Sequence, residues 1–460
     1  MKNIIVGQSG GPTAVINSSV VGVYEAAKEL GSTHIYGMVH GIEGFLKGEY
    51  IDLKEVLDEE KVELLKRTPS AYLGSCRYKL PSFEKDKEVY EKIFSKLDEL
   101  EIEYFFYIGG NDSMDTIKML SDYAKENGKS QRFIGIPKTI DNDLPITDHC
   151  PGYGSAVKYI ATSLKEIIRD NESFGVEKPT VCIVEIMGRH AGWLTAGAAL
   201  AKGEDCCGAD AIYLPEETFD IDEFKARVKH LADTKSSVVI AVSEGITTAD
   251  GKFVCELSAA DVAVDAFGHK QLSGCAKTLA DIIHNEFGLK TRAIEFSTLQ
   301  RAATHLASLT DINEAIEVGK LAVKAADEGK TGMMITILRD NNYGIYDIHD
   351  IANVEKKIPV AAGLAGGSTD AMASASLSKS TVFSLEDWII ERSSTSAEET
   401  PKLFLVISVL IMETRLLPMM RTPVSFSLMC DSDMSDSASS EFRMATLFFW
   451  NLLRSILPKL

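Results

Sequence analysis

Short apolar runs rich in valine and isoleucine recur along the chain as far as Phe296, and each ends at a glycine-rich or polar turn. Segments with helical spacing lie between them, for example 15–30 and 117–124. Strands that alternate with helices are typical of an α/β fold with mostly parallel sheets buried on both faces. There are more runs than one compact sheet holds, so we expect two lobes with a cleft between them. The predicted strands are Asn3–Val6, Ile35–Val39, Phe105–Ile108, Phe133–Ile136, Val181–Ile186, Val238–Val242 and Ala293–Phe296.

The pattern changes after Pro359. Residues 361–368 read Ala-Ala-Gly-Leu-Ala-Gly-Gly-Ser, which is typical of a linker, and serine-rich patches then alternate with isolated apolar blocks. Such a segment buries too little apolar surface to offset the entropy of ordering it. We therefore expect residues 361–460 to form an atypical, poorly ordered tail. The alternative is an altered reading frame at the end of the gene.

Composition narrows the possible partners. A net charge of −19 disfavours general nucleic-acid binding, which needs a basic face to neutralise phosphates. The longest apolar run, 403–412, is too short to span a bilayer, so no membrane partner is expected. The eight cysteines contain no Cys-x-x-Cys pair, which favours reduced thiols. Because Met1 is followed directly by a predicted strand, we expect no signal peptide and a cytoplasmic protein.

Two neighbouring strand ends carry the candidate chemistry. The run 105–108 is followed by Gly-Gly-Asn-Asp-Ser at 109–113, and the run 133–136 by Pro-Lys-Thr-Ile-Asp-Asn-Asp at 137–143. The carboxyl ends of parallel strands meet at one edge of a sheet, so these loops predict a phosphate-handling site. Asparagine and aspartate oxygens can bind Mg²⁺, and a carboxylate can act as the base for an acceptor hydroxyl.

Each of these loops also has a purely structural interpretation. Asp112 could simply cap the following helix, and 141–143 could be an Asx-rich turn. Lys138 favours the functional interpretation of the second loop, because it places a positive charge for phosphate beside the carboxylates.

Other predicted strands end in groups that suit the same chemistry. Ser9-Gly10-Gly11 follows the first strand, Met187-Gly188-Arg189 follows the run 181–186, and Glu244 follows the run 238–242. Glycines let backbone amides approach an anion, and an arginine can bind phosphate through two parallel hydrogen bonds. Arg292 and Gln300-Arg301 bracket one more strand. Taken singly, each of these signals is weak.

Together the segments closely resemble the 6-phosphofructokinase family, in the family's order, over about residues 1–359. The motifs are Ser9-Gly10-Gly11, Leu73-Gly74-Ser75-Cys76-Arg77, Gly109-Gly110-Asn111-Asp112-Ser113, Thr139-Ile140-Asp141-Asn142-Asp143, Met187-Gly188-Arg189, Glu244 and Leu299-Gln300-Arg301. The resemblance implies the phosphofructokinase fold of two Rossmann-like lobes. Residues 1–152 with 299–345 would form the phosphoryl-donor lobe, and 153–298 with 346–360 the sugar-phosphate lobe.

The resemblance also implies roles for individual residues. Asp141 would deprotonate the C1 hydroxyl of fructose 6-phosphate, with Asp112 and Lys138 as further catalytic residues. Arg292 would reach the site of a neighbouring subunit, which implies a homodimer or homotetramer. Mg²⁺ would be bound at Asn111, where many members have aspartate, and Thr298 replaces a histidine or tyrosine. The sugar phosphate would be held by Thr139, Ile140, Asp141, Met187, Gly188, Arg189, Glu244, Arg292, Thr298 and Arg301, and the donor by Gly11, Arg77, Gly110 and Ser113.

Two positions indicate which phosphoryl donor is used. Members that use ATP have glycine at the positions of Asp112 and Lys138, whereas pyrophosphate-dependent members have aspartate and lysine, as here. A carboxylate at 112 would repel the α-phosphate of a nucleotide, and Lys138 would stabilise the departing phosphate. The resemblance thus implies reversible phosphoryl transfer from diphosphate to fructose 6-phosphate. One alternative is an ATP-dependent enzyme of the same fold. Another is a non-catalytic regulatory subunit, but such a subunit has no need to keep Asp141, Arg189 and Glu244.

Overall fold

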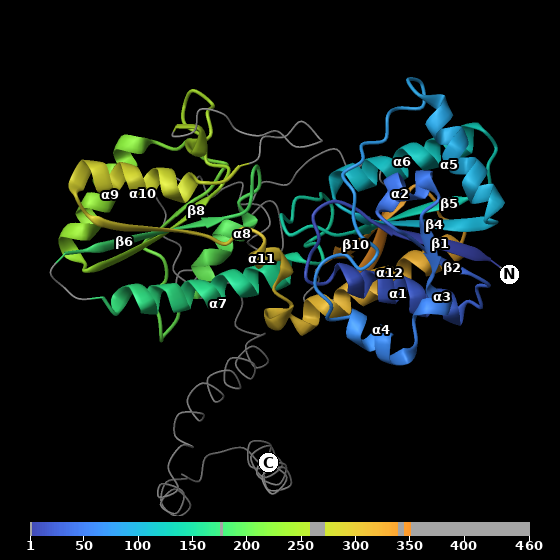
Figure 1. The fold of residues 1–460 in the computed structure, drawn as a ribbon, viewed down its shortest axis with the longest axis horizontal. Coiled ribbons are helices and arrows are strands. Elements are labelled where there is room, and N and C mark those ends of the chain that lie inside the picture. Colours follow the sequence, from blue (N-terminus) through green and yellow to red (C-terminus); the bar gives the residue numbers. More distant parts are fainter. Residues whose placement is uncertain (1, 175–177, 258–271, 339–344, 351–460) are drawn as a thin grey trace, which may run out of the picture. The chain divides into compact units, whose positions relative to one another are not determined.

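In the computed structural model, the described residues are 2–174, 178–257, 272–338 and the strand 345–350 (Figure 1). The predicted tail, 361–460, lies outside this part of the chain. All described residues belong to one compact unit, which contains two sheets.

The first sheet has seven strands in the order β11-β10-β5-β4-β1-β2-β3. Its central strands pair in parallel, whereas β3 and β11 are antiparallel to their neighbours at the two edges. The residues of β1 and nearly all of those in β4 are buried, which explains why these strands read as continuous apolar runs rather than alternating ones. The strands are β1 (Asn3–Gln8), β2 (Ile35–Met38), β3 (Tyr50–Asp52), β4 (Ile102–Gly109), β5 (Arg132–Pro137), β10 (Met333–Leu338) and β11 (Ile345–Asp350).

Helices cover both faces of the first sheet (Figure 1). On one face α1 (Ile16–Glu29) and α12 (Leu309–Asp327) pack over a core that includes Val20 and Val318, with α3 (Leu53–Val56) and α4 (Glu59–Leu65) beside them. On the other face α2 (Gly41–Lys47), α5 (Lys87–Glu99) and α6 (Asn111–Glu126) pack over a second core rich in aromatic side chains. This sandwich leaves the carboxyl ends of β1, β4 and β5 as neighbours.

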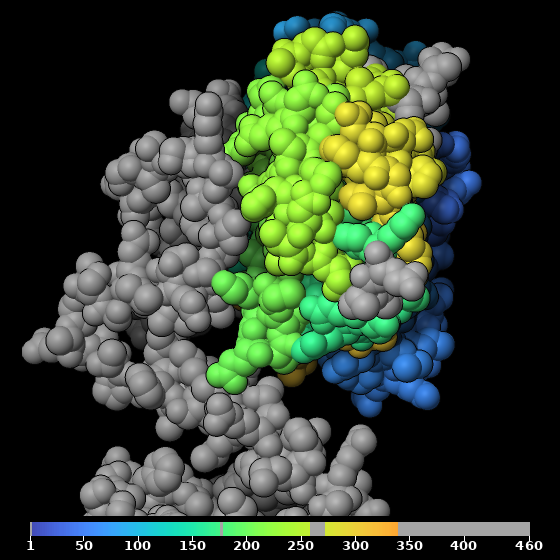
Figure 2. Space-filling view, turned by 90° about the vertical axis from the view of Figure 1, so that its left-hand side faces the viewer, coloured from blue at the N-terminus to red at the C-terminus, as the bar shows by residue number. Residues whose placement is uncertain are grey.

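The second sheet has four parallel strands in the order β7-β8-β6-β9. These are β6 (Thr180–Ile186), β7 (Ala211–Tyr213), β8 (Ser237–Ser243) and β9 (Lys290–Glu295). One face is covered by α7 (Tyr153–Glu172), α8 (Trp193–Ala196) and the 3₁₀ turn η1 (Gly197–Ala201). The other is covered by α9 (Ile221–Thr234), the turn η2 (Val254–Leu257) and α10 (Cys275–Phe287). In the end-on view, the yellow surface of α10 lies above the teal surface of α7 (Figure 2).

The structure confirms the predicted α/β fold, and every predicted strand is present within one or a few residues of its expected bounds. Two boundaries of the predicted lobes differ from the structure. Residues 346–350 belong to the first sheet rather than the second lobe, because β11 pairs with β10. The short helices α11 (Leu299–Ala302) and η3 (Thr304–Leu306) pack against α7 of the second lobe, where Ala303 joins the core around Tyr159 and Phe296.

Candidate active site

Three loops of the first lobe meet because β5, β4 and β1 are adjacent in the sheet. The backbone nitrogen of Lys138 donates to the carbonyl of Gly109 at 3.0 Å, which ties the loop after β5 to the end of β4. The Lys138 ammonium donates to the carbonyl of Gly11 at 2.7 Å, which ties the same loop to the glycines after β1. The structure thus brings together Gly11, Gly110 and Lys138, for which contacts with the phosphoryl donor are expected from the sequence.

Lys138 is almost completely buried, with an exposed fraction of 3%. Burial lowers the pKa of its ammonium to about 8; Asp141 and Asp143 oppose this shift and Arg301 adds to it. The carbonyl of Gly11 solvates the charge but does not neutralise it. A buried cation of this kind is stabilised further when a phosphate binds beside it.

The carboxylates after β5 lie on a tightly folded turn. Asn142 has a positive φ of 53° and its side-chain oxygen accepts from the backbone nitrogen of Cys150 at 2.8 Å. The backbone nitrogen of Asp141 donates to the hydroxyl of Thr139 at 3.0 Å. The amide nitrogen of Asn111 donates to Asp143 at 2.7 Å, so the loop after β4 contacts this turn. The turn is therefore both an Asx-stabilised structure and a part of the site.

Asp112 lies within the first turn of α6 rather than at its cap, which is Gly110. The helix begins there without a side-chain cap hydrogen bond. A negative charge in the first turn is stabilised by the helix dipole. Ser113 is buried against the Gly109 turn, since a β-carbon on Gly109 would overlap its hydroxyl. The helix-cap interpretation of Asp112 is therefore not what the structure shows.

The second lobe contributes the loops after β6 and β8. The backbone nitrogen of Gly188 donates to the Glu244 carboxyl at 3.4 Å, and the Ser243 hydroxyl donates to the carbonyl of Gly188 at 2.5 Å. Gly188 has a φ of 140°, which a residue with a side chain rarely adopts. The Gln300 side chain accepts from the backbone nitrogen of Met187 at 3.3 Å.

Ser243 and Gln300 were not among the predicted site residues. Both are almost fully buried and hold backbone atoms of the 187–189 loop. Gln300 stands in the motif Leu299-Gln300-Arg301 but had no predicted role, and the only signal for Ser243 was its position beside Glu244.

Electrostatic interactions join the two sets of loops. Burial raises the pKa of Glu244 to about 7; the Gly188 amide opposes the shift, and the negative charge of Asp141 adds to it. Burial also lowers the pKa of Arg301, as does the neighbouring charge of Arg77, while Asp141 and Glu244 act in the opposite direction. The Arg301 guanidinium lies against Gly11 of the first lobe, because a β-carbon on Gly11 would be 3.1 Å from its Nη1. Acidic and basic groups from both sheets thus face one another.

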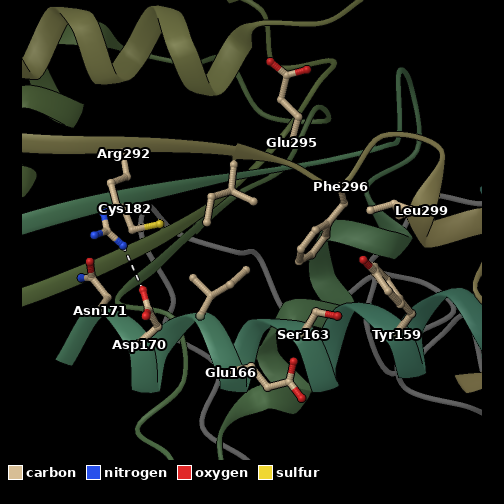
Figure 3. Close-up of a pocket in the computed structure, with 12 residues that line it drawn as sticks. Tyr159, Ser163, Glu166, Asp170, Asn171, Cys182, Arg292, Glu295, Phe296 and Leu299 are labelled. Carbon is tan, nitrogen blue, oxygen red and sulfur yellow. Dashed lines mark hydrogen bonds and ion pairs between the residues drawn. The ribbon is translucent and has the colours of Figure 1, made fainter. Parts of the chain in front are cut away.

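Three further predicted site residues take no part in the contacts described above. Arg292 lies on the edge strand β9, where its Nη1 is 2.9 Å from Asp170 and its guanidinium stacks 4.2 Å from the centre of the Phe174 ring. It lines a cavity of about 400 Å³ between β9 and α7 (Figure 3). Thr298 is exposed, and the Ile140 side chain is buried in the core of the second lobe. Ile140 could contact a substrate only through its backbone.

The donor atoms suit a magnesium ion that is bound mainly by substrate. Among the described residues, no group of three or more His, Cys, Asp or Glu side chains is placed to hold a metal ion. The oxygens near the start of α6 and on the 139–143 turn are amide and carboxylate oxygens, which Mg²⁺ prefers. The Asn111 nitrogen is directed to Asp143, so its carbonyl oxygen is the atom able to ligate. Mg²⁺ usually keeps several waters and binds through one or two such groups plus substrate phosphates.

Comparison with known proteins gives concordant matches. The sequence profile of the family described as phosphofructokinase matches residues 3–326. The pyrophosphate–fructose 6-phosphate 1-phosphotransferase of Methylococcus capsulatus is 40% identical over 369 residues, which cover 78% of this chain and 86% of that protein. The enzyme of the same name from Xanthomonas campestris is 41% identical over 363 residues, covering 78% and 86%.

A solved structure is also similar. The crystal structure of pyrophosphate-dependent phosphofructokinase from Nitrosospira multiformis superposes with a TM-score of 0.69 at 36% identity, covering 78% of this chain and 86% of that one. Among the helices of the described segments, none combines the length and apolarity needed to cross a membrane.

Proposed function

The chain belongs to the phosphofructokinase family, and we propose on this premise that it transfers a phosphoryl group reversibly between pyrophosphate and the C1 hydroxyl of fructose 6-phosphate. The forward products are fructose 1,6-bisphosphate and phosphate. This is a kinase-type phosphotransferase reaction of glycolysis, and relatives at about 40% identity carry the corresponding name.

The observation that carries the choice of donor is the buried ammonium of Lys138 against the carbonyl of Gly11. In the forward reaction it would stabilise the phosphate that leaves, which carries more charge than the end of a nucleotide diphosphate. Asp112, in the first turn of α6, would repel the additional phosphate of a nucleotide. Both features favour pyrophosphate over ATP, which is the main alternative.

On the acceptor side, Asp141 would take the proton of the C1 hydroxyl as it attacks the phosphorus. Glu244 and the 187–189 loop would bind the sugar hydroxyls, and Arg301 its 6-phosphate. The raised pKa of Glu244, about 7, lets its protonated form donate a hydrogen bond to the sugar near neutral pH. The buried ammonium of Lys138 and the opposite charges of Asp141 and Arg301 near one another support a catalytic role over a non-catalytic regulatory subunit.

Mg²⁺ fits as the metal of this reaction. When bound, it would neutralise charge on the transferred phosphoryl group. Asn111 and the neighbouring carboxylates would orient the ion while pyrophosphate supplies most of its ligands. The role of this chain is then to place oxygen donors, exclude water and hold the charges of Lys138 and Arg301.

We further propose a homodimer or homotetramer in the cytoplasm. Arg292 lies apart from the other site residues, on an edge strand whose residues are only partly covered within one chain. A second copy at that edge would bring Arg292 to the sugar phosphate of a neighbouring site. The seven described cysteines are free thiols, which suits a reducing compartment.

The proposed function is tested by following both directions of the reaction with the purified full-length chain. Fructose 6-phosphate with pyrophosphate and Mg²⁺ should give fructose 1,6-bisphosphate, and fructose 1,6-bisphosphate with phosphate should give pyrophosphate. If a folded protein with Mg²⁺ present turned over substrates in neither direction, the proposal would be contradicted.

A further inference from the structure

Three charged side chains meet behind the catalytic turn, at the end of its loop. The Nδ1 atom of His149 lies 2.9 Å from the Asp148 carboxylate, and its Nε2 lies 2.8 Å from the Glu314 carboxylate on α12. The exposed fractions of the side chains of His149 and Glu314 are 23% and 14%. Because both ring nitrogens face carboxylates, both carry hydrogen and the ring is an imidazolium. No substrate contact has been assigned to any of the three.

A second contact fixes the same stretch of chain to α12. Asp311, one helical turn before Glu314, accepts from the backbone nitrogens of Gly152 at 2.8 Å and Ser155 at 2.9 Å. It is buried, with an exposed fraction of 2%. Residues three apart lie on one face of a helix. One face of α12 therefore holds residues 149–155 at two points, through Glu314 and through Asp311.

This fixed stretch is connected directly to the catalytic turn. The residue after His149, Cys150, donates its backbone N–H to the side chain of Asn142 at 2.8 Å. Asn142 lies between Asp141 and Asp143 and has a positive φ, which asparagine tolerates and which the hydrogen bond of its side chain helps to hold. The contacts therefore run from α12 through His149 and the Cys150 amide to the turn that carries Asp141.

We propose that Glu314 and His149 are positioning residues for phosphoryl transfer. Their ion pair fixes the Cys150 amide, and this amide holds the Asn142 turn so that the Asp141 carboxylate stays in reach of the acceptor hydroxyl. The catalytic part of this inference rests on the proposed function, whereas the ordering of the turn does not. Small displacements of a reacting group lower the rate strongly, because the bound geometry must be close to that of attack.

The charge of the imidazolium is consistent with this role. Burial alone would lower the pKa of His149, but the hydrogen bonds to Asp148 and Glu314 outweigh it and raise the pKa to about 9. Asp311 also faces this ring electrostatically. Removal of Glu314 leaves His149 with fewer negative neighbours, so its pKa should fall.

The test compares Glu314→Ala and Glu314→Gln with Glu317→Ala in the full-length chain. Glu317 is the matched control, since it lies on α12 three residues further on, is 47% exposed and pairs with Lys320 at 3.8 Å. Three quantities are measured: kcat and KM for both substrates, amide exchange at Cys150, and the pKa of the His149 ring by NMR.

We expect Glu314→Ala to lower kcat about tenfold with both KM values within about threefold of wild type, and to speed exchange at Cys150. Glu314→Gln keeps a hydrogen-bond acceptor without the charge, so its effect on kcat and on exchange should be intermediate. If the alanine variant does not fold, the glutamine variant tests the positioning role in its place. The control should match wild type.

Unchanged kcat despite faster exchange at Cys150, or unchanged exchange despite a lowered His149 pKa, would overturn the positioning role. A wild-type protein without pyrophosphate activity would refute the proposed function instead, while the exchange data would still decide whether Glu314 orders the turn.

Discussion

Among single residues, Lys138 is notable because its buried ammonium is only partly compensated by neighbouring groups. An ammonium group is rarely buried, because removal from water costs free energy that only partners can offset. Here the partners are the carbonyl of Gly11 and the nearby carboxylates of Asp141 and Asp143, and the pKa is still lowered to about 8. Such incomplete compensation is what a site for a highly charged anion requires, since the bound anion completes it.

We predict that Asp141→Asn lowers kcat by at least about 100-fold, which is the usual contribution of a positioned base. The KM for fructose 6-phosphate should change by less than about threefold, because the lost interaction acts mainly in the transition state. Asp143→Asn is measured in parallel by steady-state kinetics, because Asp143 is the other carboxylate of the same turn. If Asp141→Asn keeps its kcat and Asp143→Asn loses it, the base is Asp143.

The buried carboxyl of Glu244 should lower the free energy of unfolding as the pH rises. Burial raises its pKa to about 7 from an ordinary value of 4.5. The folded state thus binds this proton more tightly than the unfolded state, and stability is lost as the pH rises from about 4.5 through about 7. We expect Glu244→Gln to raise the free energy of unfolding by up to about 3 kcal/mol at about pH 8.5, and by little at about pH 4.5.

The measurement is urea unfolding of the Glu244→Gln variant and wild type across this pH range, with Glu217→Gln as the control. A difference between Glu244→Gln and wild type that does not vary with pH would show that Glu244 is not strained by burial.

At the scale of elements, α1 and α12 approach each other unusually closely. A β-carbon on Gly22 would lie 2.0 Å from the backbone oxygen of Ile316, and one on Gly319 would lie 2.4 Å from that of Ser19. The two helices can therefore pack at this distance only with glycine at the crossing. Since α12 also carries Asp311 and Glu314, this crossing sets the position from which α12 contacts residues 149–155.

We predict that Gly22→Ala destabilises the protein by about 1–3 kcal/mol or more, because added volume in a close-packed contact forces the backbones apart. Alanine has the higher helix propensity, so a local effect alone would be stabilising. Lys28→Ala, at an exposed position of α1, is the control. A rise in the thermal midpoint of Gly22→Ala would contradict the tight crossing.

The elements that the sequence predicted well are those with continuous apolar runs. The central strands β1, β4, β5, β6 and β8 carry such runs because both of their faces are buried. The short edge strands β3 and β7 are only partly buried and gave no comparable signal. The run 333–338, which forms β10, begins with two methionines, a residue common in helices, so its pattern does not by itself indicate a strand.

At the scale of the whole molecule, strand pairing between distant parts of the chain could not be deduced from local pattern. β11 returns to the first sheet and α11 packs on the second lobe, so the lobes exchange segments at places where the sequence shows no break. The motifs at strand ends could be predicted as one site because parallel strands share a carboxyl edge. The contacts by which Ser243, Gln300 and Glu314 hold other loops could not be predicted, because each contact is made with a segment distant in the sequence.

We predict that subunits complement one another if Arg292 serves a neighbouring site. Co-expression of Arg292→Ala and Asp141→Asn chains should restore about a quarter of wild-type activity, because half of the random dimers are hybrids with one intact site of two. Each variant alone should be nearly inactive. If purified hybrids form but have no more activity than the separate variants, Arg292 acts within its own chain.

We propose that Asp112 and Lys138 together specify pyrophosphate as the phosphoryl donor. This proposal is tested most directly by kcat/KM for pyrophosphate and for ATP, measured on wild type and on the double variant Asp112→Gly with Lys138→Gly. We expect the wild type to turn over with pyrophosphate and essentially not with ATP. The double variant should lose at least about 100-fold with pyrophosphate, since the buried charge acts in the transition state. Comparable kcat/KM values for the two donors in wild type would show that Asp112 and Lys138 do not select the donor.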